Sequence, residues 1–232
     1  MSEIIIDHEL VANSTSVEKA EFYKKTYAHV AGAFLVFLVL EGLFLNIGFM
    51  RDLAVQMTQG MSWLIVLGLF MLATTQAEKM VARATSINKQ YLGLFIYVLA
   101  EAIIFVPLMM VAMAYLGTAV LMQAMILTIA LFAGLSAVVL ITKKDFSFMR
   151  SIITVGSIIA LGLIVAGIIF GFDLGLWFSG AMVLLAAGSI LYQTSNMIYR
   201  YSNDQYVLAS LGLFASFMLL LWYIIQIFLS RD

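Results

Sequence analysis

Apolar residues follow one another in long blocks along most of this chain, from about Tyr27 onward. Each block holds about twenty residues, the length that an α-helix needs to cross a hydrocarbon core of roughly 30 Å. Hydrophobic residues make up 64% of the 232 residues and charged residues 11%, so a soluble fold of this size would leave much apolar surface in water. The pattern therefore predicts an all-α membrane protein with several spans.

Charged residues and turns divide the apolar sequence into seven predicted spans. The first ends at the charged pair 51–52 and the second at the pair 78–79. The apolar stretch 91–142 is about twice as long as one span requires, so we divide it near Gly117. The predicted spans are 27–50, 60–77, two within 91–142, 152–172, 174–198 and 206–229.

The basic residues predict how the chain is oriented. With seven spans, ten of the twelve Lys and Arg residues fall on the side of the N-terminus, and only Arg51 and Arg231 fall on the other. Because cytoplasmic loops carry the excess of basic residues, we expect a cytoplasmic N-terminus and an external C-terminus. Residues 1–26 are polar, carry five acids and lack the apolar core of a signal peptide. We therefore expect a cytoplasmic N-terminal tail over 1–26 and a transmembrane domain over 27–232.

The composition argues against several classes of function. The chain has no cysteine, only two histidines and no His-Glu-x-x-His sequence, so it offers neither a thiolate site nor a zinc-hydrolase motif. A net charge of −1 provides no basic field for nucleic acid. We expect no enzymatic activity, with a membrane hydrolase the least favoured reading, and no metal, cofactor or nucleic-acid partner. The predicted surrounding is the lipid bilayer.

Two acidic residues inside apolar spans are the main chemical signal. Glu41 lies in the first predicted span and Glu101 in the third, at depths that would let them share a cavity, and no basic residue lies within a span to pair with them. A carboxyl group in hydrocarbon stays protonated or sits where water or an ion reaches it. The two residues are therefore a candidate proton or cation path. The alternative is that each neutral side chain joins neighbouring helices by hydrogen bonds.

The only proline, Pro107, lies shortly after Glu101 in the same predicted span. Proline leaves a backbone carbonyl of the preceding turn without its helical hydrogen bond. This carbonyl could line the same path, so Pro107 joins the candidate site. A simple kink in the helix is the alternative.

Two short segments at the ends of spans carry a family resemblance. Residues 142–148 read Thr-Lys-Lys-Asp-Phe-Ser-Phe, and residues 191–198 read Leu-Tyr-Gln-Thr-Ser-Asn-Met-Ile. Together with the seven spans and the sequence Ser-Leu-Gly-Leu that begins at Ser210, they resemble the Bax-inhibitor (TMBIM) family, most closely its bacterial YccA-type branch. The resemblance implies a bundle of six helices around a central C-terminal helix, without enzymatic activity. The motif residues are Lys143, Lys144, Asp145, Thr194, Ser195 and Asn196.

The chain departs from the family pattern at two positions. In the calcium-leak members an aspartate of the sixth span faces another in the seventh, and protonation of this pair gates the path. The matching positions in this chain are Gln193 and Phe214. Glutamine does not titrate and phenylalanine offers calcium no oxygen ligand, so we do not expect a pH-gated calcium leak of that type.

The resemblance also implies a function. YccA-type proteins modulate the membrane-anchored protease FtsH, which engages their cytoplasmic N-terminal tail. We therefore expect a non-enzymatic regulator of membrane-protein quality control in the bacterial inner membrane, with an FtsH-type protease as its partner. The alternative is a calcium or proton leak channel that uses Glu41 and Glu101 in place of the lost pair.

Overall fold

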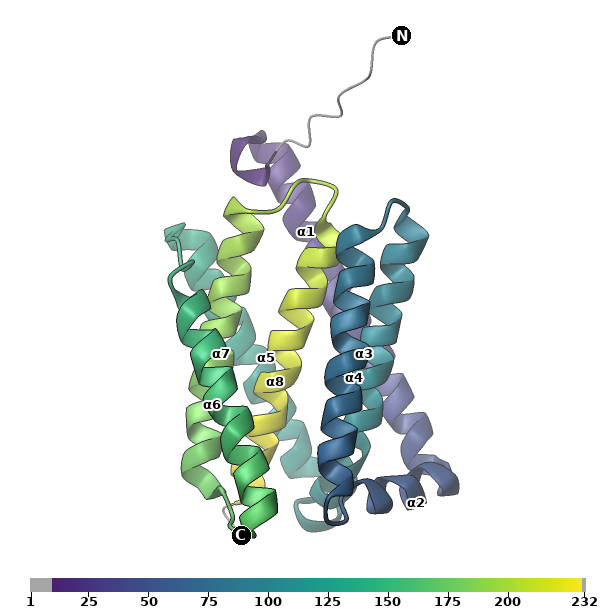
Figure 1. The fold of residues 1–232 in the computed structure, drawn as a ribbon. Coiled ribbons are helices and arrows are strands. Elements are labelled where there is room, and N and C mark those ends of the chain that lie inside the picture. The colour runs from purple at the N-terminus through teal and green to yellow at the C-terminus, as the bar shows by residue number, and fades with distance from the viewer. Residues whose placement is uncertain (1–9, 231–232) are drawn as a thin grey trace.

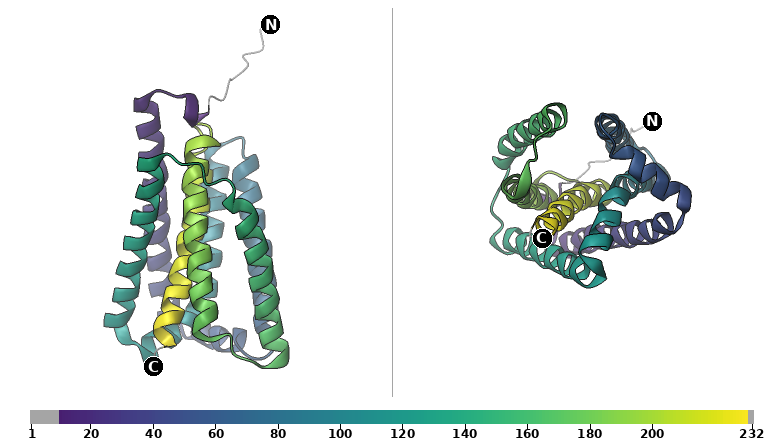
Figure 2. Two further views of the ribbon diagram at one scale, coloured as in Figure 1. Left: turned by 90° about the vertical axis from the view of Figure 1, so that its left-hand side faces the viewer. Right: turned by 90° about the horizontal axis from the view of Figure 1, so that it is seen from below.

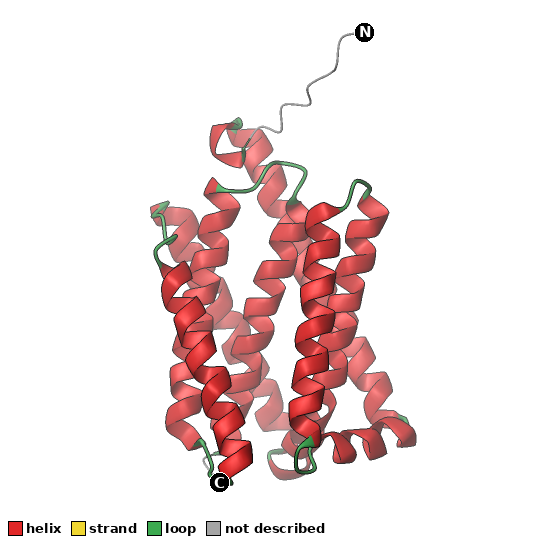
Figure 3. Cartoon of the chain, viewed as in Figure 1, coloured by secondary structure: helices red, strands yellow, loops and turns green. Residues whose placement is uncertain are grey.

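The computed structural model describes residues 10–230, and over this range the chain is helical apart from short connections (Figure 1, Figure 3). Seven of the helices are long and apolar enough to cross a membrane, which confirms the predicted seven-span, all-α architecture. The elements are η1 (Val11–Asn13), α1 (Ser16–Asn46), α2 (Gly48–Met57), α3 (Ser62–Arg83), α4 (Ile87–Tyr115), α5 (Gly117–Thr142), α6 (Met149–Phe170), α7 (Gly175–Tyr199) and α8 (Tyr206–Leu229).

The long apolar stretch 91–142 is divided where the sequence predicted. α4 ends at Tyr115 and α5 begins at Gly117, with one residue between them. Gly117 has a φ of +71°, in the left-handed region that glycine adopts without strain, and the chain turns back across the bundle there. Pro107 does not interrupt α4, which continues through it with the proline buried.

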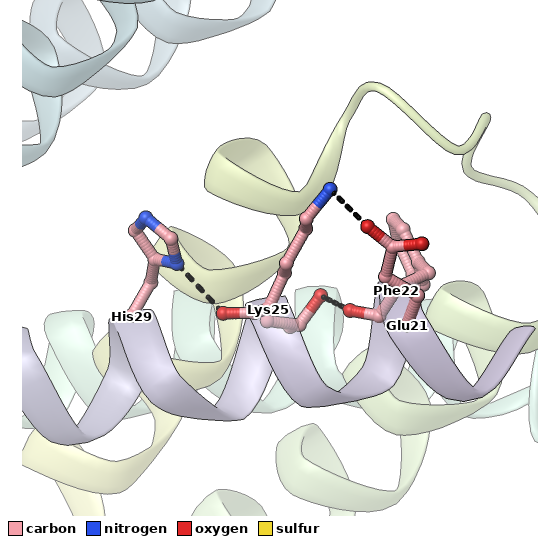
Figure 4. A network of polar contacts seen from close by, with 5 residues as sticks. Glu21, Phe22, Lys25 and His29 are labelled. Carbon is pink, nitrogen blue, oxygen red and sulfur yellow. Dashed lines mark hydrogen bonds and ion pairs between the residues drawn. The ribbon is translucent and has the colours of Figure 1, made fainter. Parts of the chain in front are cut away.

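The first helix begins well before the predicted span. α1 starts at Ser16 because Thr15 and Glu18 form a capping box. The Glu18 N–H donates to Thr15 Oγ1 at 3.3 Å, and the Thr15 N–H donates to Glu18 Oε2 at 2.8 Å. Farther along this helix, Lys25 and Glu21 form an ion pair of 2.7 Å (Figure 4). The predicted boundary at residue 27 therefore falls inside one continuous helix.

Residues that precede α1 are held against the connection between α7 and α8. Val11 is fully buried, and its N–H donates to Tyr201 O at 2.9 Å. The side-chain amide of Asn203 donates to Ser14 Oγ at 2.6 Å. We call these contacts of residues 10–14 the N-terminal clasp. Residues 10–26 of the expected tail thus belong to the folded bundle, and residues 1–9 lie outside the described structure.

A short helix that the sequence did not predict follows α1. The chain is extended at Ile47, where α1 has ended, and α2 then runs across the end of the bundle opposite the N-terminus (Figure 1). Arg51 and Asp52 lie within α2, so they do not mark the end of the first span as we expected. The buried side chains of Ala54 and Met57 give this helix an inner face against the bundle.

The C-terminal helix α8 lies at the centre of the bundle (Figure 2). In its most apolar 18-residue window 72% of the residues are buried, compared with 6% in the corresponding window of α6. Helices α1, α4, α5 and α7 all pack against α8. The arrangement confirms the expected central C-terminal helix.

The helices around α8 leave one side of the bundle open. α3 packs against α4, and α6 packs against α7. Seen along the bundle, α3 and α6 stand apart on the rim (Figure 2). Residues of both helices line one cavity, and α8 forms its floor.

Candidate functional site

A cavity of about 1320 Å³ runs along one side of α8. Its walls come from α3, α4, α6 and α7. One end is at Glu78, in the last turns of α3, on the end of the bundle that carries the start of α1; we call this end the N-terminal face. The other end is at Asp173, in the turn between α6 and α7. The cavity therefore extends along most of the length of the spans.

Glu101 lies in the middle of this cavity. It is at the centre of α4 and is only 6% exposed, yet it is one of the lining residues. Within residues 10–230 its carboxyl group has no hydrogen bond and no salt bridge. The hydroxyl of Tyr97, one turn away on the same helix, lies within electrostatic range of both Glu101 and Glu78. Pro107 also lines the cavity, toward the opposite face.

Glu41, the other candidate acid, lies outside this cavity. It is 2% exposed on α1, and neither of its carboxylate oxygens has a hydrogen-bond partner among the described residues. One turn from each acid, Phe37 of α1 and Phe105 of α4 meet edge to face with ring centroids 5.1 Å apart. Phe105 lines the cavity and Phe37 does not. The structure thus does not bring Glu41 and Glu101 into one cavity.

Polar groups of α7 and α8 also line the cavity. Ser189 Oγ and Ser216 Oγ are hydrogen-bonded at 2.8 Å. Gln193 lies against Gly212, where an added Cβ would come within 2.9 Å of the Gln193 side chain. The absence of a side chain at Gly212 therefore allows Gln193 to lie flat on α8. All four residues line the cavity.

Gln193 and Phe214, the two positions that we expected to match the family carboxylates, do not face each other. Gln193 lies on the cavity wall, whereas Phe214 is fully buried within the bundle. The Phe214 ring meets the Tyr97 ring edge to face, with centroids 6.3 Å apart. Phe214 therefore makes an apolar contact with the tyrosine that lies one turn from Glu101.

The two family motifs meet at the N-terminal face. Asp145 Oδ1 accepts hydrogen bonds from the Ser147 N–H at 2.8 Å and from Ser195 Oγ at 3.3 Å. Ser195 Oγ in turn accepts from the Phe146 N–H at 3.0 Å. The Ser147 backbone bond is the main reason that the pKa of Asp145 is lowered from its ordinary value. These motif residues thus fasten the connection between α5 and α6 to the end of α7.

The remaining motif residues have different surroundings. Lys143 ends α5 with a φ of +50°, and its carbonyl accepts a hydrogen bond from the Tyr199 hydroxyl. Lys144 is exposed. Thr194 Oγ1 and Asn196 Oδ1 are buried without a hydrogen-bond partner in the described part of the chain. The motif residues therefore serve the packing of the N-terminal face, and none of the six lines the cavity.

Several cavity residues carried a weaker signal in the sequence. Tyr97 lies four residues before Glu101, and Ser216 lies four residues after Gly212, so each pair shares one face of a helix. That spacing would have placed Tyr97 beside Glu101. The partner helices could not be found in this way, because spacing within a helix does not show which helix packs against it.

A bundle of seven apolar helices with an acidic cavity on one side of its central helix defines the class, a polytopic α-helical membrane protein. Residues 10–230 contain no group of three or more His, Asp or Glu residues that could hold a metal ion. The chain belongs to the Bax inhibitor family, since the family profile described as inhibitor of apoptosis-promoting Bax1 matches residues 19–232.

Individual relatives agree with this assignment. The chain is 24% identical to Bax inhibitor 1 of Schizosaccharomyces pombe over 222 residues, which cover 94% of this chain and 79% of the relative. It is 37% identical to an uncharacterized protein of Pseudomonas aeruginosa over 113 residues, 48% of this chain and 50% of that protein. It is 33% identical to the modulator of FtsH protease YccA of Escherichia coli over 125 residues, 53% of this chain and 52% of YccA. The matches to the two bacterial relatives thus span about half of their length.

Proposed function

We propose that this protein is a non-enzymatic modulator of membrane-protein quality control whose partner is a membrane protease of the FtsH type. The similarity to the modulator of FtsH protease YccA supports this proposal. The N-terminal clasp supports it as well, because a protease that pulls on the N-terminus must first break the contacts of residues 10–14. The clasp is the structural observation on which the proposal rests.

An ATP-driven protease pulls on a chain end and unfolds the structure attached to it. Here the first described residues are tied down by a buried Val11 and by the Asn203 bond to Ser14, directly before a 31-residue helix. Opening the clasp would release residues 10–14 and lengthen the segment within reach of the protease. A substrate that binds the protease but unfolds slowly would keep the protease occupied. Other substrates would then be degraded more slowly, and in this way the protein would act as a modulator.

The test compares the half-lives of three variants in cells that contain an FtsH-type protease, together with co-purification of each variant. Deletion of residues 1–9 should lengthen the half-life because the protease loses its handle. Asn203→Ala should shorten it because the clasp opens more easily. Asn88→Ala, an exposed asparagine on the same face, serves as the control and should have no effect. Equal half-lives without any association with the protease would contradict the proposal.

We place the protein in the bacterial inner membrane with the N-terminal face in the cytoplasm. The basic side chains of the described helix ends and loops support this orientation, because those outside α2 lie on the N-terminal face (Figure 1). A reporter fused after Asp232 should then be active only outside the cytoplasm. Cytoplasmic activity of that reporter would reverse the assignment.

A leak of calcium or protons is the second candidate function. It is favoured by Glu101, which has no hydrogen bond or salt bridge within residues 10–230 and lies in a cavity that extends along most of the spans. Glu41 is outside that cavity, so we expect only Glu101 to contribute to the path. In liposomes that contain the purified protein, Glu101→Gln should reduce any calcium or proton flux, and Glu41→Gln should leave it unchanged. A flux that survives in Glu101→Gln would remove this residue from the path.

A further inference from the structure

The acidic and basic side chains that line the cavity are all acidic. They are Glu78, Glu101 and Asp173, and no Lys, Arg or His is found among the described lining residues. The whole chain is nearly neutral, with a net charge of −1, so this bias belongs to the cavity and does not reflect the composition. A ligand of this cavity should therefore carry positive charge.

Glu101 provides the second observation. Its side chain is more than nine-tenths buried, lies on the cavity wall and makes no hydrogen bond or salt bridge with any residue between 10 and 230. The hydroxyls of Ser189 and Ser216, which line the same cavity, are hydrogen-bonded to each other. A carboxylate that loses water and gains no partner is unfavourable, and a bound cation would supply the missing charge.

The walls of the cavity favour an organic cation over a metal ion. Calcium requires six to eight oxygen ligands, and the described residues contain no cluster of three His, Asp or Glu. Aromatic rings line the cavity instead, and a cation over the face of such a ring is stabilised by the charge distribution of the ring. These aromatic residues are Trp63, Phe70, Tyr97, Phe105, Tyr115, Phe172, Phe178, Trp222 and Tyr223.

The size and position of the cavity agree with this ligand. Its volume of about 1320 Å³ is larger than the roughly 300 to 1000 Å³ of typical small-molecule sites, so the cavity has room for a bulky organic cation. Its two rims, α3 and α6, are apolar candidate spans that stand apart on the outside of the bundle (Figure 2). A cation with an apolar body, dissolved in the bilayer, could therefore enter between α3 and α6. Its positive charge would then reach Glu101 at the centre of α4.

We infer that this cavity binds lipophilic cations, organic molecules that carry one positive charge on an apolar and preferably aromatic body, with Glu101 as the counter-charge. Tyr97, Trp63 and Trp222 contact the apolar body. This binding site does not depend on the proposed relation to a protease, because no residue of the N-terminal clasp takes part in it.

The experiment measures equilibrium binding of tetraphenylphosphonium to the full chain in nanodiscs of zwitterionic lipid, after subtraction of empty nanodiscs. Tetraphenylborate, which has the same shape and the opposite charge, is the matched ligand control. Binding of the cation should be saturable and should quench tryptophan fluorescence, because Trp63 and Trp222 line the site, whereas Trp177 is 92% exposed. Saturable binding of the anion with equal affinity would overturn the inference.

Three variants locate the site. Glu101→Gln should weaken binding of the cation roughly tenfold or more, since a buried charge would lose its partner. Glu41→Gln, an equally buried acid outside the cavity, should bind as the wild type does. Ala215→Phe should abolish binding by filling the cavity from α8, whatever the charge at position 101. Unchanged affinity in Glu101→Gln or in Ala215→Phe, in protein that remains monodisperse and helical, would overturn the inference.

Discussion

Glu41 and Glu101 are the same residue type at the same level of burial, each inside a long apolar helix, and they differ in what lies beside them. Glu101 lies on the wall of a cavity with Tyr97 next to it. Glu41 lies outside that cavity, with both carboxylate oxygens unbonded within the described chain. An acid in a membrane helix is therefore defined as a candidate site by the open space and the groups around it, and burial alone does not distinguish the two.

Replacement of each acid by lysine should give the largest difference between them. A lysine at the centre of a membrane helix costs about 2.5 to 3.5 kcal/mol, unless its charge finds water or a partner. Glu41→Lys has neither and should lose most of its folded protein. Glu101→Lys lies in the cavity that also contains Glu78, so a substantial part should fold. Size-exclusion profiles and thermal unfolding in detergent would measure this, and equal losses would remove the distinction between the two acids.

Replacement of each acid by methionine should change the stability less than replacement by lysine. For Glu41 the change should be a stabilisation. Removing an unbonded carboxyl group while keeping a similar volume should stabilise the bundle by about 1 to 2 kcal/mol. Glu101→Met should change stability little, because its side chain borders open space, but it should abolish binding of the phosphonium cation. Thermal midpoints of the two variants provide the measurement. A lower midpoint in Glu41→Met would mean that Glu41 has a partner, such as a buried water.

Asp145 can be compared with Glu41 and Glu101, because it lies outside the membrane and its carboxylate accepts hydrogen bonds. Its hydrogen bonds lower its pKa below the ordinary value of 3.8, so they stabilise the fold above that pH and are lost as the pH falls through the lowered pKa. Asp145→Asn should cost less than about 1 kcal/mol at neutral pH. The difference from the wild type should shrink below pH 4. Unfolding measured between pH 7 and pH 3 tests this, with the exposed Asp52→Asn as the control.

The spans and most of their ends could be predicted because the length of an apolar block determines whether a helix can cross a bilayer. The break at Gly117 followed from length alone, and α8 begins and ends at the predicted residues. Two local features were missed. α1 extends to Ser16 because polar residues continue the helix beyond the membrane, and α2 lies along the end of the bundle, where hydropathy gives no span signal.

The candidate site was predicted less well than the fold. The sequence identified Glu41 and Glu101 and their approximate depth, but not the direction in which each side chain points around its helix. Similarly, nothing in the sequence distinguished Gly212, which makes room for Gln193, from glycines such as Gly162, which has no atom within 4 Å of an added Cβ. Such contacts depend on which helix is the neighbour, and that is a property of the assembled bundle.

The central place of α8 has a consequence for the order in which the protein is made. The ribosome produces the chain from the N-terminus, so the six spans before α8 enter the membrane before the helix against which five of them pack. Until α8 arrives, the side chains that will contact it face one another or the lipid. The last span to be synthesised thus completes the interior, and a chain cut short before Tyr206 would be inserted in the membrane without a core.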